Sequence, residues 1–366
     1  LHPRVRRQRQ MCIRDSSYGV VSGWVFGNDG YMGTAITKRG NKKLTWETTS
    51  EFNIGLDLGF FDNRISLSME YYNRIISDLL VSNKSLPAYN EINTIAANIG
   101  KTQGRGFELT LSTVNIMNKD WTWSTDFTFY TFKDNWYERD PNWKPAAYES
   151  KKDPIRSYYS YVSDGLLQVG EKAPAWQPTL VPGQIKLKNL YDTGTSPNVL
   201  DQYDKVNLGS QDPKCTLGLN NTLRYKNLDF NIYFYGEIGR LRGASYYDAW
   251  IVGLGNSLTN VSQQSLHSYT NANQNTTVPN LIESAYDFGD YYHKKINYLR
   301  CRNITLGYTI PVSKSIANSV RISANVSNPF VFTNWNGVDP ETDTGNFSYP
   351  NVTSFSFGID LSLIHI

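Results

Sequence analysis

The stretch LTWETTSEFNIGLDLGFFDNRISLSMEYYNR, residues 44–74, alternates apolar and polar side chains with a period of two. From Leu44 to Phe60 the even-numbered positions are mostly apolar, and the odd-numbered positions are polar or glycine. Residues 61–64 form a turn-like break, and the alternation resumes from Ile65 to Ile75. Because successive side chains of a strand point to opposite faces, the pattern predicts a long antiparallel hairpin with one apolar face.

The same alternation recurs along the chain and predicts further strands at residues 107–112, 121–129, 217–225, 228–238, 320–326 and 355–361. Across these strands and the two of the hairpin, the apolar parity carries no charged residue. The polar parity carries twelve: Glu47, Glu51, Asp57, Glu70, Arg74, Glu108, Asp126, Arg224, Asp229, Glu237, Arg321 and Asp360. A charge facing lipid at mid-membrane costs about 2–4 kcal/mol, least for acids, so membrane-spanning strands require this separation.

A soluble β-sandwich also hides one face of each strand, but two features favour a membrane barrel. Several predicted strands are long enough to span a bilayer at a tilt, which needs about 9–11 residues. The connections also alternate between short and long. The short ones are 61–64, 115–120, 226–227 and 311–319, and the long ones are 76–104, 133–154, 240–298 and 328–352. Short periplasmic turns and long extracellular loops are typical of bacterial outer-membrane barrels.

Three further strands are predicted at 155–162, 184–190 and 299–310, which brings the expected total to about eleven. The predicted fold is therefore an all-β transmembrane antiparallel barrel in the bacterial outer membrane.

Composition excludes several other classes of protein. The net charge is +3 over 366 residues, without the clustered basic face that nucleic-acid binding needs. No apolar run reaches the roughly 18 residues of a transmembrane helix. Cys12, Cys215 and Cys301 form no CxxC pair and are odd in number, so neither a disulfide framework nor a zinc site is expected. No cofactor is predicted.

The two ends of the chain differ from the rest. The opening LHPRVRRQRQMCIRDS is basic but lacks the apolar segment of a signal peptide; a basic nucleic-acid-binding arm is the other functional interpretation. MCIRDS resembles a translated sequencing-adapter read, and the closing LSLIHI resembles the same artefact. We therefore expect residues 1–16 and 363–366 to be artefactual and residues 17–362 to be barrel.

Residues 44–74 resemble a segment of the SusC/RagA family of TonB-linked outer-membrane proteins. Four more stretches resemble family segments in the same order: NIGKTQGRGFEL (98–109), YLRCRNITLGYTIP (298–311), GVDPETDTG (337–345) and YPNVTSFSFGIDL (349–361). The resemblance covers about residues 36–361 and implies the C-terminal half of such a barrel. The stretch NLYDTGTSPNVLDQYDKVNLG (189–209) departs from the family pattern, since its Asp-rich core is mostly missing. No metal role is carried over to it.

This resemblance implies a TonB-dependent importer of a nutrient, with a barrel of about 22 strands around an N-terminal plug upstream of these residues. It implies a SusD-like surface lipoprotein as partner, and the TonB–ExbB–ExbD system through the missing N-terminal part. A glycan is the favoured cargo and a peptide the alternative. An energy-independent structural or adhesive barrel is the alternative function. No Ser/His or metal constellation appears, so an enzyme is not expected.

The candidate ligand-binding residues are aromatic side chains in the predicted extracellular loops, because flat rings stack on sugars and pack on peptides. They are Trp136, Trp143, Tyr246, Tyr247, Trp250, Tyr291 and Tyr292. Packing among the loops, or an aromatic girdle at the membrane edge, is the alternative for each. Trp46, Trp121 and Trp123 occupy apolar-parity positions and are assigned to the girdle.

One acidic pattern is a weak alternative as a metal site. Asp339, Glu341 and Asp343 have the 1-3-5 spacing of a calcium loop. The glycine then falls at position seven, and Pro350 stands at position twelve where the loop needs Glu. A solvated extracellular loop is favoured, and no metal is predicted.

The parity assignment leads to a direct prediction. In the intact barrel, Phe52→Arg or Leu56→Arg should block membrane insertion, because both side chains face lipid. The matched Glu51→Arg should be tolerated, because it faces the lumen. Folding yields are measured by heat-modifiability on a gel, and equal yields for the three variants would contradict the strand assignment.

Overall fold

The computed structural model describes residues 15–26, 29–86, 94–141, 144–191, 198–243, 263–280, 287–312, 319–342 and 349–362. The chain forms two compact units. Unit 1 comprises Leu1–Asn53, Tyr72–Arg105 and Asp134–Lys144, and unit 2 comprises Ile54–Tyr71, Gly106–Lys133 and Pro145–Ile366. Of the two end segments expected to be artefactual, residues 1–14 and 363–366 lie outside the described residues.

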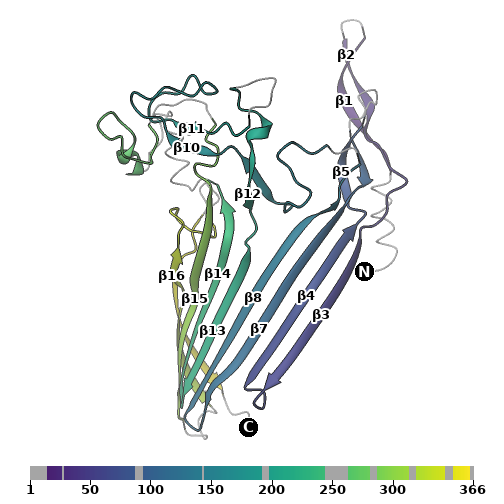
Figure 1. The fold of residues 1–366 in the computed structure, drawn as a ribbon. Coiled ribbons are helices and arrows are strands. Elements are labelled where there is room, and N and C mark those ends of the chain that lie inside the picture. The colour runs from purple at the N-terminus through teal and green to yellow at the C-terminus, as the bar shows by residue number, and fades with distance from the viewer. Residues whose placement is uncertain are drawn as a thin grey trace. The chain divides into compact units, whose positions relative to one another are not determined.

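Nine strands form one sheet in the hydrogen-bonded order β17-β16-β15-β14-β13-β8-β7-β4-β3 (Figure 1). They are β3 (Thr48–Phe60), β4 (Ile65–Ser77), β7 (Lys101–Met117), β8 (Trp121–Glu138), β13 (Cys215–Tyr225), β14 (Leu228–Arg242), β15 (Lys294–Ile310), β16 (Ser319–Thr333) and β17 (Ser354–Ser362). The pairs from β8 to β17 are antiparallel. The order in the sheet follows the order in the chain, and the all-β antiparallel fold predicted from the alternation is confirmed.

The remaining strands form two-stranded ribbons. These ribbons are β1 (Ser17–Phe26) with β2 (Asp29–Lys38), β5 (Leu80–Ser85) with β6 (Thr94–Asn98), β9 (Ser157–Ser160) with β12 (Val206–Ser210), and β10 (Ser163–Leu166) with β11 (Ile185–Leu187). Two short 3-10 helices are η1 (Gln202–Asp204) and η2 (Gln263–His267).

Residues 155–162 and 184–190 were expected among the long strands, but they contribute to the ribbons β9–β12 and β10–β11 instead. Their strands contain only three to five residues, too few to cross a bilayer. Prolines and positive-φ glycines such as Gly165, Gly170 and Gly183 interrupt this stretch. The described sheet therefore has nine strands where about eleven were predicted.

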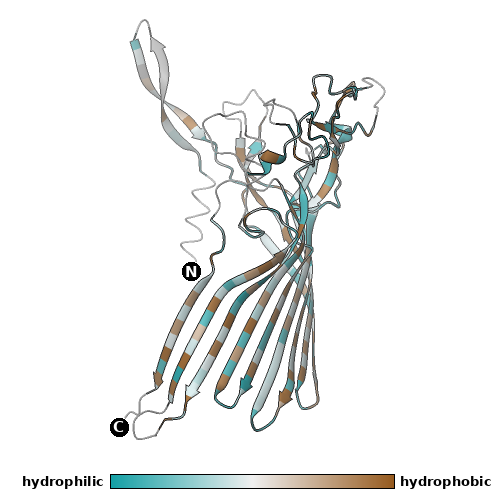
Figure 2. Ribbon diagram, turned by 90° about the vertical axis from the view of Figure 1, so that its left-hand side faces the viewer, coloured by the Kyte–Doolittle hydropathy of each residue, from teal (hydrophilic) through white to brown (hydrophobic). Residues whose placement is uncertain are grey.

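In unit 2 the strand register keeps apolar and polar side chains in separate rows. Leu219 of β13 pairs with Phe127 of β8 on one side and with Phe234 of β14 on the other. The next residue, Asn220, pairs with Asp126 and Tyr233. Figure 2 shows the alternation as brown and teal bands along the strands.

The apolar rows stay exposed, with Phe357 at 83% and Ile359 at 75% of full exposure. Large apolar side chains in a continuous exposed row suit a surface that lipid covers.

The polar rows are joined by side-chain hydrogen bonds across strands. Arg321 of β16 pairs with Asp229 of β14 at 2.6 Å and with Asp360 of β17 at 3.5 Å. Its bond to Asp229 crosses β15 at Gly307, where the absence of a side chain leaves the path open. Asn231 of β14 donates to Asn220 and Thr222 of the adjacent strand β13. Arg321 thus offsets the charges of Asp229 and Asp360 within the sheet.

Aromatic rings gather on the apolar rows near the short turns. Trp121 and Tyr225 pair across β8 and β13 with ring centroids 4.3 Å apart. The Trp123 indole donates to Asn221, which also accepts a bond from Thr125. Amphipathic rings at this level are the arrangement that an interfacial aromatic girdle requires.

The connections in unit 2 sort by length. Residues 226–227 and 311–318 join β13 to β14 and β15 to β16, whereas 243–293 and 334–353 join β14 to β15 and β16 to β17. Because the strands are antiparallel, the two short connections lie at one end of this part of the sheet and the two long ones at the other. The strands extend further into the long connections than the alternation predicted.

In unit 1, β3 begins at Thr48 and not at Leu44. Leu44 is buried, and the Asn98 side chain bonds both the N–H and the carbonyl of Thr45. The Glu47 carboxylate accepts the N–H of Leu80. These contacts hold residues 44–47 in an irregular segment. No helix within the described ranges is long and apolar enough to cross a membrane.

The crossing at Gly307 predicts a cost for any side chain there. A Cβ would lie 2.6 Å from Asp229 and closer still to the Arg321 guanidinium. Gly307→Val should lower stability by about 1–3 kcal/mol through overpacking. Gly104→Val is the matched control, because its Cβ meets nothing within 4 Å. The two variants are compared by urea unfolding in lipid vesicles, and equal stabilities would contradict the proposed crossing.

Candidate ligand-binding site

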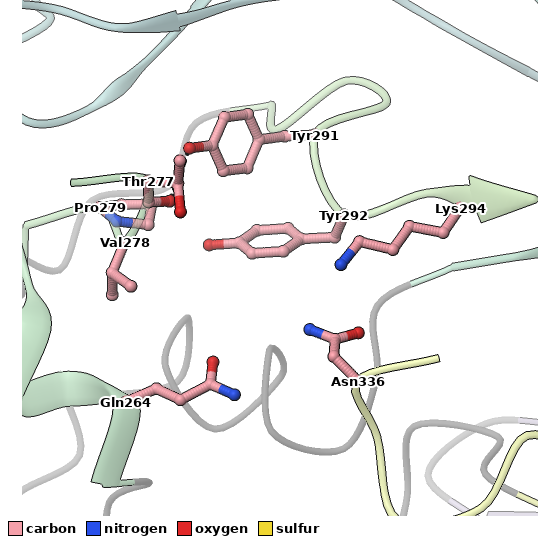
Figure 3. Close-up of a pocket in the computed structure, with 8 residues that line it drawn as sticks. All are labelled: Gln264, Thr277, Val278, Pro279, Tyr291, Tyr292, Lys294 and Asn336. Carbon is pink, nitrogen blue, oxygen red and sulfur yellow. Dashed lines mark hydrogen bonds between the residues drawn. The ribbon is translucent and has the colours of Figure 1, made fainter. Parts of the chain in front are cut away.

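A cavity of about 350 Å³ lies among the long connections of unit 2 (Figure 3). Four short segments line it, from η2, from residues 277–279, from the approach to β15 and from the connection after β16. The lining residues are Gln264, Thr277, Val278, Pro279, Tyr291, Tyr292, Lys294 and Asn336. The site therefore offers two aromatic rings, two amides and one ammonium group.

The two tyrosine rings are fixed by their neighbours. Tyr291 donates its hydroxyl to the carbonyl of Thr277 at 2.6 Å. Its ring meets that of Tyr292 edge-on at 5.3 Å, and Phe288 packs edge-on against Tyr292 at 5.9 Å. Rings held in this way offer a face to a ligand at little further entropic cost.

The tyrosines pack against a small core outside the sheet. Its buried members are Leu166, Ile185, Leu187 and Tyr269. Tyr269 accepts the N–H of Val169 on its hydroxyl and donates its own N–H to the carbonyl of Val278. Residues 163–187 and 263–280 are thus tied together, and the segment 277–279 is held in place beside the cavity.

Glycine is required at two close approaches in this core. Gly183 has φ +89°, and a Cβ there would lie 2.6 Å from the Tyr269 ring. Gly289 has φ +58°, and a Cβ there would lie 2.6 Å from Leu187. Only glycine combines that backbone conformation with so little space.

The connection after β16 is clamped by buried ion pairs. Arg300 of β15 pairs with Asp339 at 2.8 Å and with Glu341 at 2.7 Å, and all three side chains are nearly inaccessible. Glu341 also bonds Arg302 and accepts the Tyr298 hydroxyl at 2.9 Å.

The other end of this connection is held through Asn334. Its side chain accepts the N–H of Asn297 and donates to the carbonyl of Lys295. Asn336 therefore lies between two anchored points.

A β-bulge brings the arginines to this clamp. Consecutive residues Tyr233 and Phe234 of β14 pair with Asn303 and Cys301, so Arg302 is skipped. Without the bulge, the alternation that sets Leu306 in the apolar row would carry Arg300 into it as well. Beyond the bulge, Arg300 pairs with Tyr235 in the polar row.

The aromatic residues predicted to bind ligand have different surroundings. Tyr291 and Tyr292 line the cavity. Trp136 lies in unit 1, where the Arg139 guanidinium sits 5.5 Å from its ring. The others lie outside the described residues: Trp143, Tyr246, Tyr247 and Trp250.

The acidic pattern serves the clamp. Asp339 and Glu341 are engaged by Arg300, and Asp343 lies outside the described residues. In the described part of the chain, no group of three metal-ligating side chains occurs. The two carboxylates already have positively charged partners.

In residues 189–209, the stretch that departs from the family pattern, the remaining acidic residues stabilise the local structure. Asp204 is fully buried and accepts three backbone N–H groups, from Leu190, Tyr191 and Asp201. Lys205 lies over the Tyr148 and Tyr161 rings at 5.6 and 5.1 Å. These contacts fix the strand β12 that follows.

Sequence reasoning missed the polar members of the cavity. Gln264, Lys294 and Asn336 carry no motif, and they meet only because the connections 243–293 and 334–353 come together beside the start of β15. Tyr269, which organises the small core, was also missed. The one available signal was the run of aromatic residues ending at Tyr292, and it did identify two lining residues.

An exposed apolar row, a hydrogen-bonded polar row and segregated connections define an outer-membrane β-barrel. Residues 15–165 match the family model described as TonB dependent receptor-like, beta-barrel. "TonB-dependent receptor P3" of Formosa agariphila is 28% identical over 98% of this chain and 38% of its own length. "TonB-dependent receptor SusC" of Bacteroides thetaiotaomicron is 28% identical over 92% of this chain and 34% of its own length.

Solved structures show the same fold. The structure of the RagAB peptide transporter aligns with a TM-score of 0.74 at 23% identity, over 96% of this chain and 39% of that one. Its open-open state aligns with a TM-score of 0.76 at 22% identity. The chain is thus part of a β-barrel of the bacterial outer membrane that is similar to TonB-dependent receptors, and it spans little more than a third of the length of these relatives.

The clamp predicts how the connection after β16 responds to mutation and acid. Burial raises the pKa of Asp339, but the N–H groups of Glu341 and Asn351 and the Arg300 guanidinium more than offset this, so the pKa lies below its ordinary value. A carboxyl with a lowered pKa stabilises the fold above its unfolded pKa of about 3.9, and the contribution is lost as pH falls through the folded value. The connection should stay protected from neutral pH down to about pH 4.

At pH 7, Asp339→Asn should speed hydrogen exchange at the N–H groups of Glu341 and Asn351 by about tenfold. Asp164→Asn is the control, because its pair with Lys188 is half exposed and 3.5 Å long. Equal exchange in both variants would show that the ion pairs do not hold the connection.

Proposed function

We propose that the chain is the C-terminal half of the barrel of a SusC/RagA-type importer, which carries a nutrient across the outer membrane with energy from TonB. The observation that carries the proposal is the similarity to TonB-dependent receptors, which runs over 98% of the chain. The structural similarity to the RagAB transporter supports the barrel fold of the proposed importer.

The partners of the proposed importer follow from the same resemblance. A SusD-like surface lipoprotein would close over the end of the barrel that carries the long connections. The TonB–ExbB–ExbD system would act through the N-terminal part of the receptor. Outer-membrane lipid would cover the exposed apolar rows.

The favoured cargo is a glycan. The cavity joins the tyrosine rings to the amides of Gln264 and Asn336, and rings with nearby hydrogen-bonding groups match the apolar faces and hydroxyl groups of a sugar. A peptide is the second candidate, because the same groups bind amide planes and RagAB is described as a peptide transporter. No step in this function calls for covalent catalysis.

An energy-independent structural or adhesive barrel is the competing function. It would need the apolar rows and the polar rows but no ordered cavity among the connections. The built cavity, with Tyr291 bonded to Thr277 and Asn336 held between two anchors, favours uptake.

The test is growth on the cognate nutrient, chosen by screening glycans and peptides against a deletion of the locus. Restoring the gene with Tyr292→Ala should raise the nutrient concentration for half-maximal growth by about two- to tenfold, the loss expected from one aromatic contact. Tyr191→Ala is the control, because Tyr191 is 61% exposed and lines no part of the cavity. If neither the deletion nor loss of TonB changes growth on any nutrient tested, the import function is wrong.

A further inference from the structure

The charges around the cavity are unbalanced. Lys294 lies in its wall, and its ammonium group points inward beside Asn336 and the Tyr292 ring (Figure 3). Within the described ranges no carboxylate forms an ion pair with Lys294. The cavity therefore presents a positive charge to whatever enters it.

The nearby carboxylates are already engaged. Asp339 and Glu341 are held by Arg300 in the clamp. Asp290 accepts the N–H and the hydroxyl of Ser163 at 2.7 and 2.6 Å. None of the three is placed to neutralise Lys294 without breaking bonds that hold the site together.

The neighbouring histidine adds no charge at neutral pH. Burial lowers the pKa of His293, and Asp290 and Gly289 only partly offset that effect. The His293 ring packs against Tyr158 with centroids 4.4 Å apart, so it belongs to the packing around the cavity. Lys294 is then the positively charged group among the lining residues.

We propose that this cavity recognises a carboxylate on the cargo, with Lys294 as the charged contact, the Asn336 and Gln264 amides as hydrogen-bond donors, and Tyr292 as the surface for the adjoining ring or plane. One ammonium group matches one singly charged anion. This inference rests on the proposed function, since both cargo classes can supply the group: a glycan through a uronic acid, and a peptide through its C-terminus.

The strand β15 provides a matched control. Lys295 follows Lys294 directly, and successive residues of a strand point to opposite faces. Lys295 does not line the cavity, and its side chain lies instead near Gly209. Lys295→Met thus removes the same charge from the same end of the same strand without touching the cavity.

Binding is measured by calorimetry on the purified full-length receptor in detergent, with two pairs of probes. Trigalacturonic acid is compared with its neutral methyl ester, and N-acetyl-tetra-alanine with its neutral C-terminal amide. The acid of at least one pair should bind about tenfold more tightly than its neutral partner. Lys294→Met should abolish the difference, whereas Lys294→Arg and Lys295→Met should keep it. The pair that shows the preference identifies the source of the carboxylate.

The proposal is overturned if the wild-type receptor binds both members of each pair equally. It is also overturned if the preference survives in Lys294→Met, or if Lys295→Met removes it equally. Since binding needs no energy coupling, a receptor with TonB-dependent uptake but no acid preference keeps the proposed function and loses this inference. A receptor that shows the acid preference but no TonB-dependent uptake keeps the carboxylate site and loses the proposed function.

Discussion

Lipid accepts neither a charge nor an unpaired backbone group, and the rest of this structure depends on that constraint. The paired strands satisfy the backbone, and the period of two confines charge to one face. The register then decides whether the separation holds across the sheet. Because Leu219, Phe127 and Phe234 share one row while Asn220 and Asp126 share the next, a slip of one residue in any strand would turn charges toward lipid.

The polar face carries the complementary requirement. Charged groups confined to a lumen still need partners, and Arg321 finds Asp229 by reaching across a strand that has glycine at the crossing. Glycine is required at position 307 because of the side chains on the neighbouring strands, and not because of its own backbone conformation. A glycine of this kind cannot be recognised from local sequence, because its reason lies in two strands on either side of it.

The fold could be predicted because the alternation is local and the lipid requirement makes it strict. The turns at 61–64 and 226–227 were found for the same reason. The irregular parts obey other rules. The residues of β9 to β12 show an alternation like that of barrel strands, but they form only short strands outside the main sheet. Distant contacts, such as that of Asp290 with Ser163, hold these short strands in place. The bulge at Arg302 also escaped prediction, because strict alternation has no place for a skipped residue.

The bulge marks the point where the membrane constraint gives way to ordinary burial. From the bulge toward Ile310, one face of β15 is apolar and faces lipid. From the bulge toward Lys294, Arg300 lies in the polar row, where it forms a buried ion pair. Such a pair adds little net stability but is costly to break. It therefore fixes the position of the connection more than it stabilises the fold. A binding cavity needs fixed walls, and its lining comes from segments far apart in the chain. Ion pairs and a small aromatic core supply that order where the sheet can no longer do so.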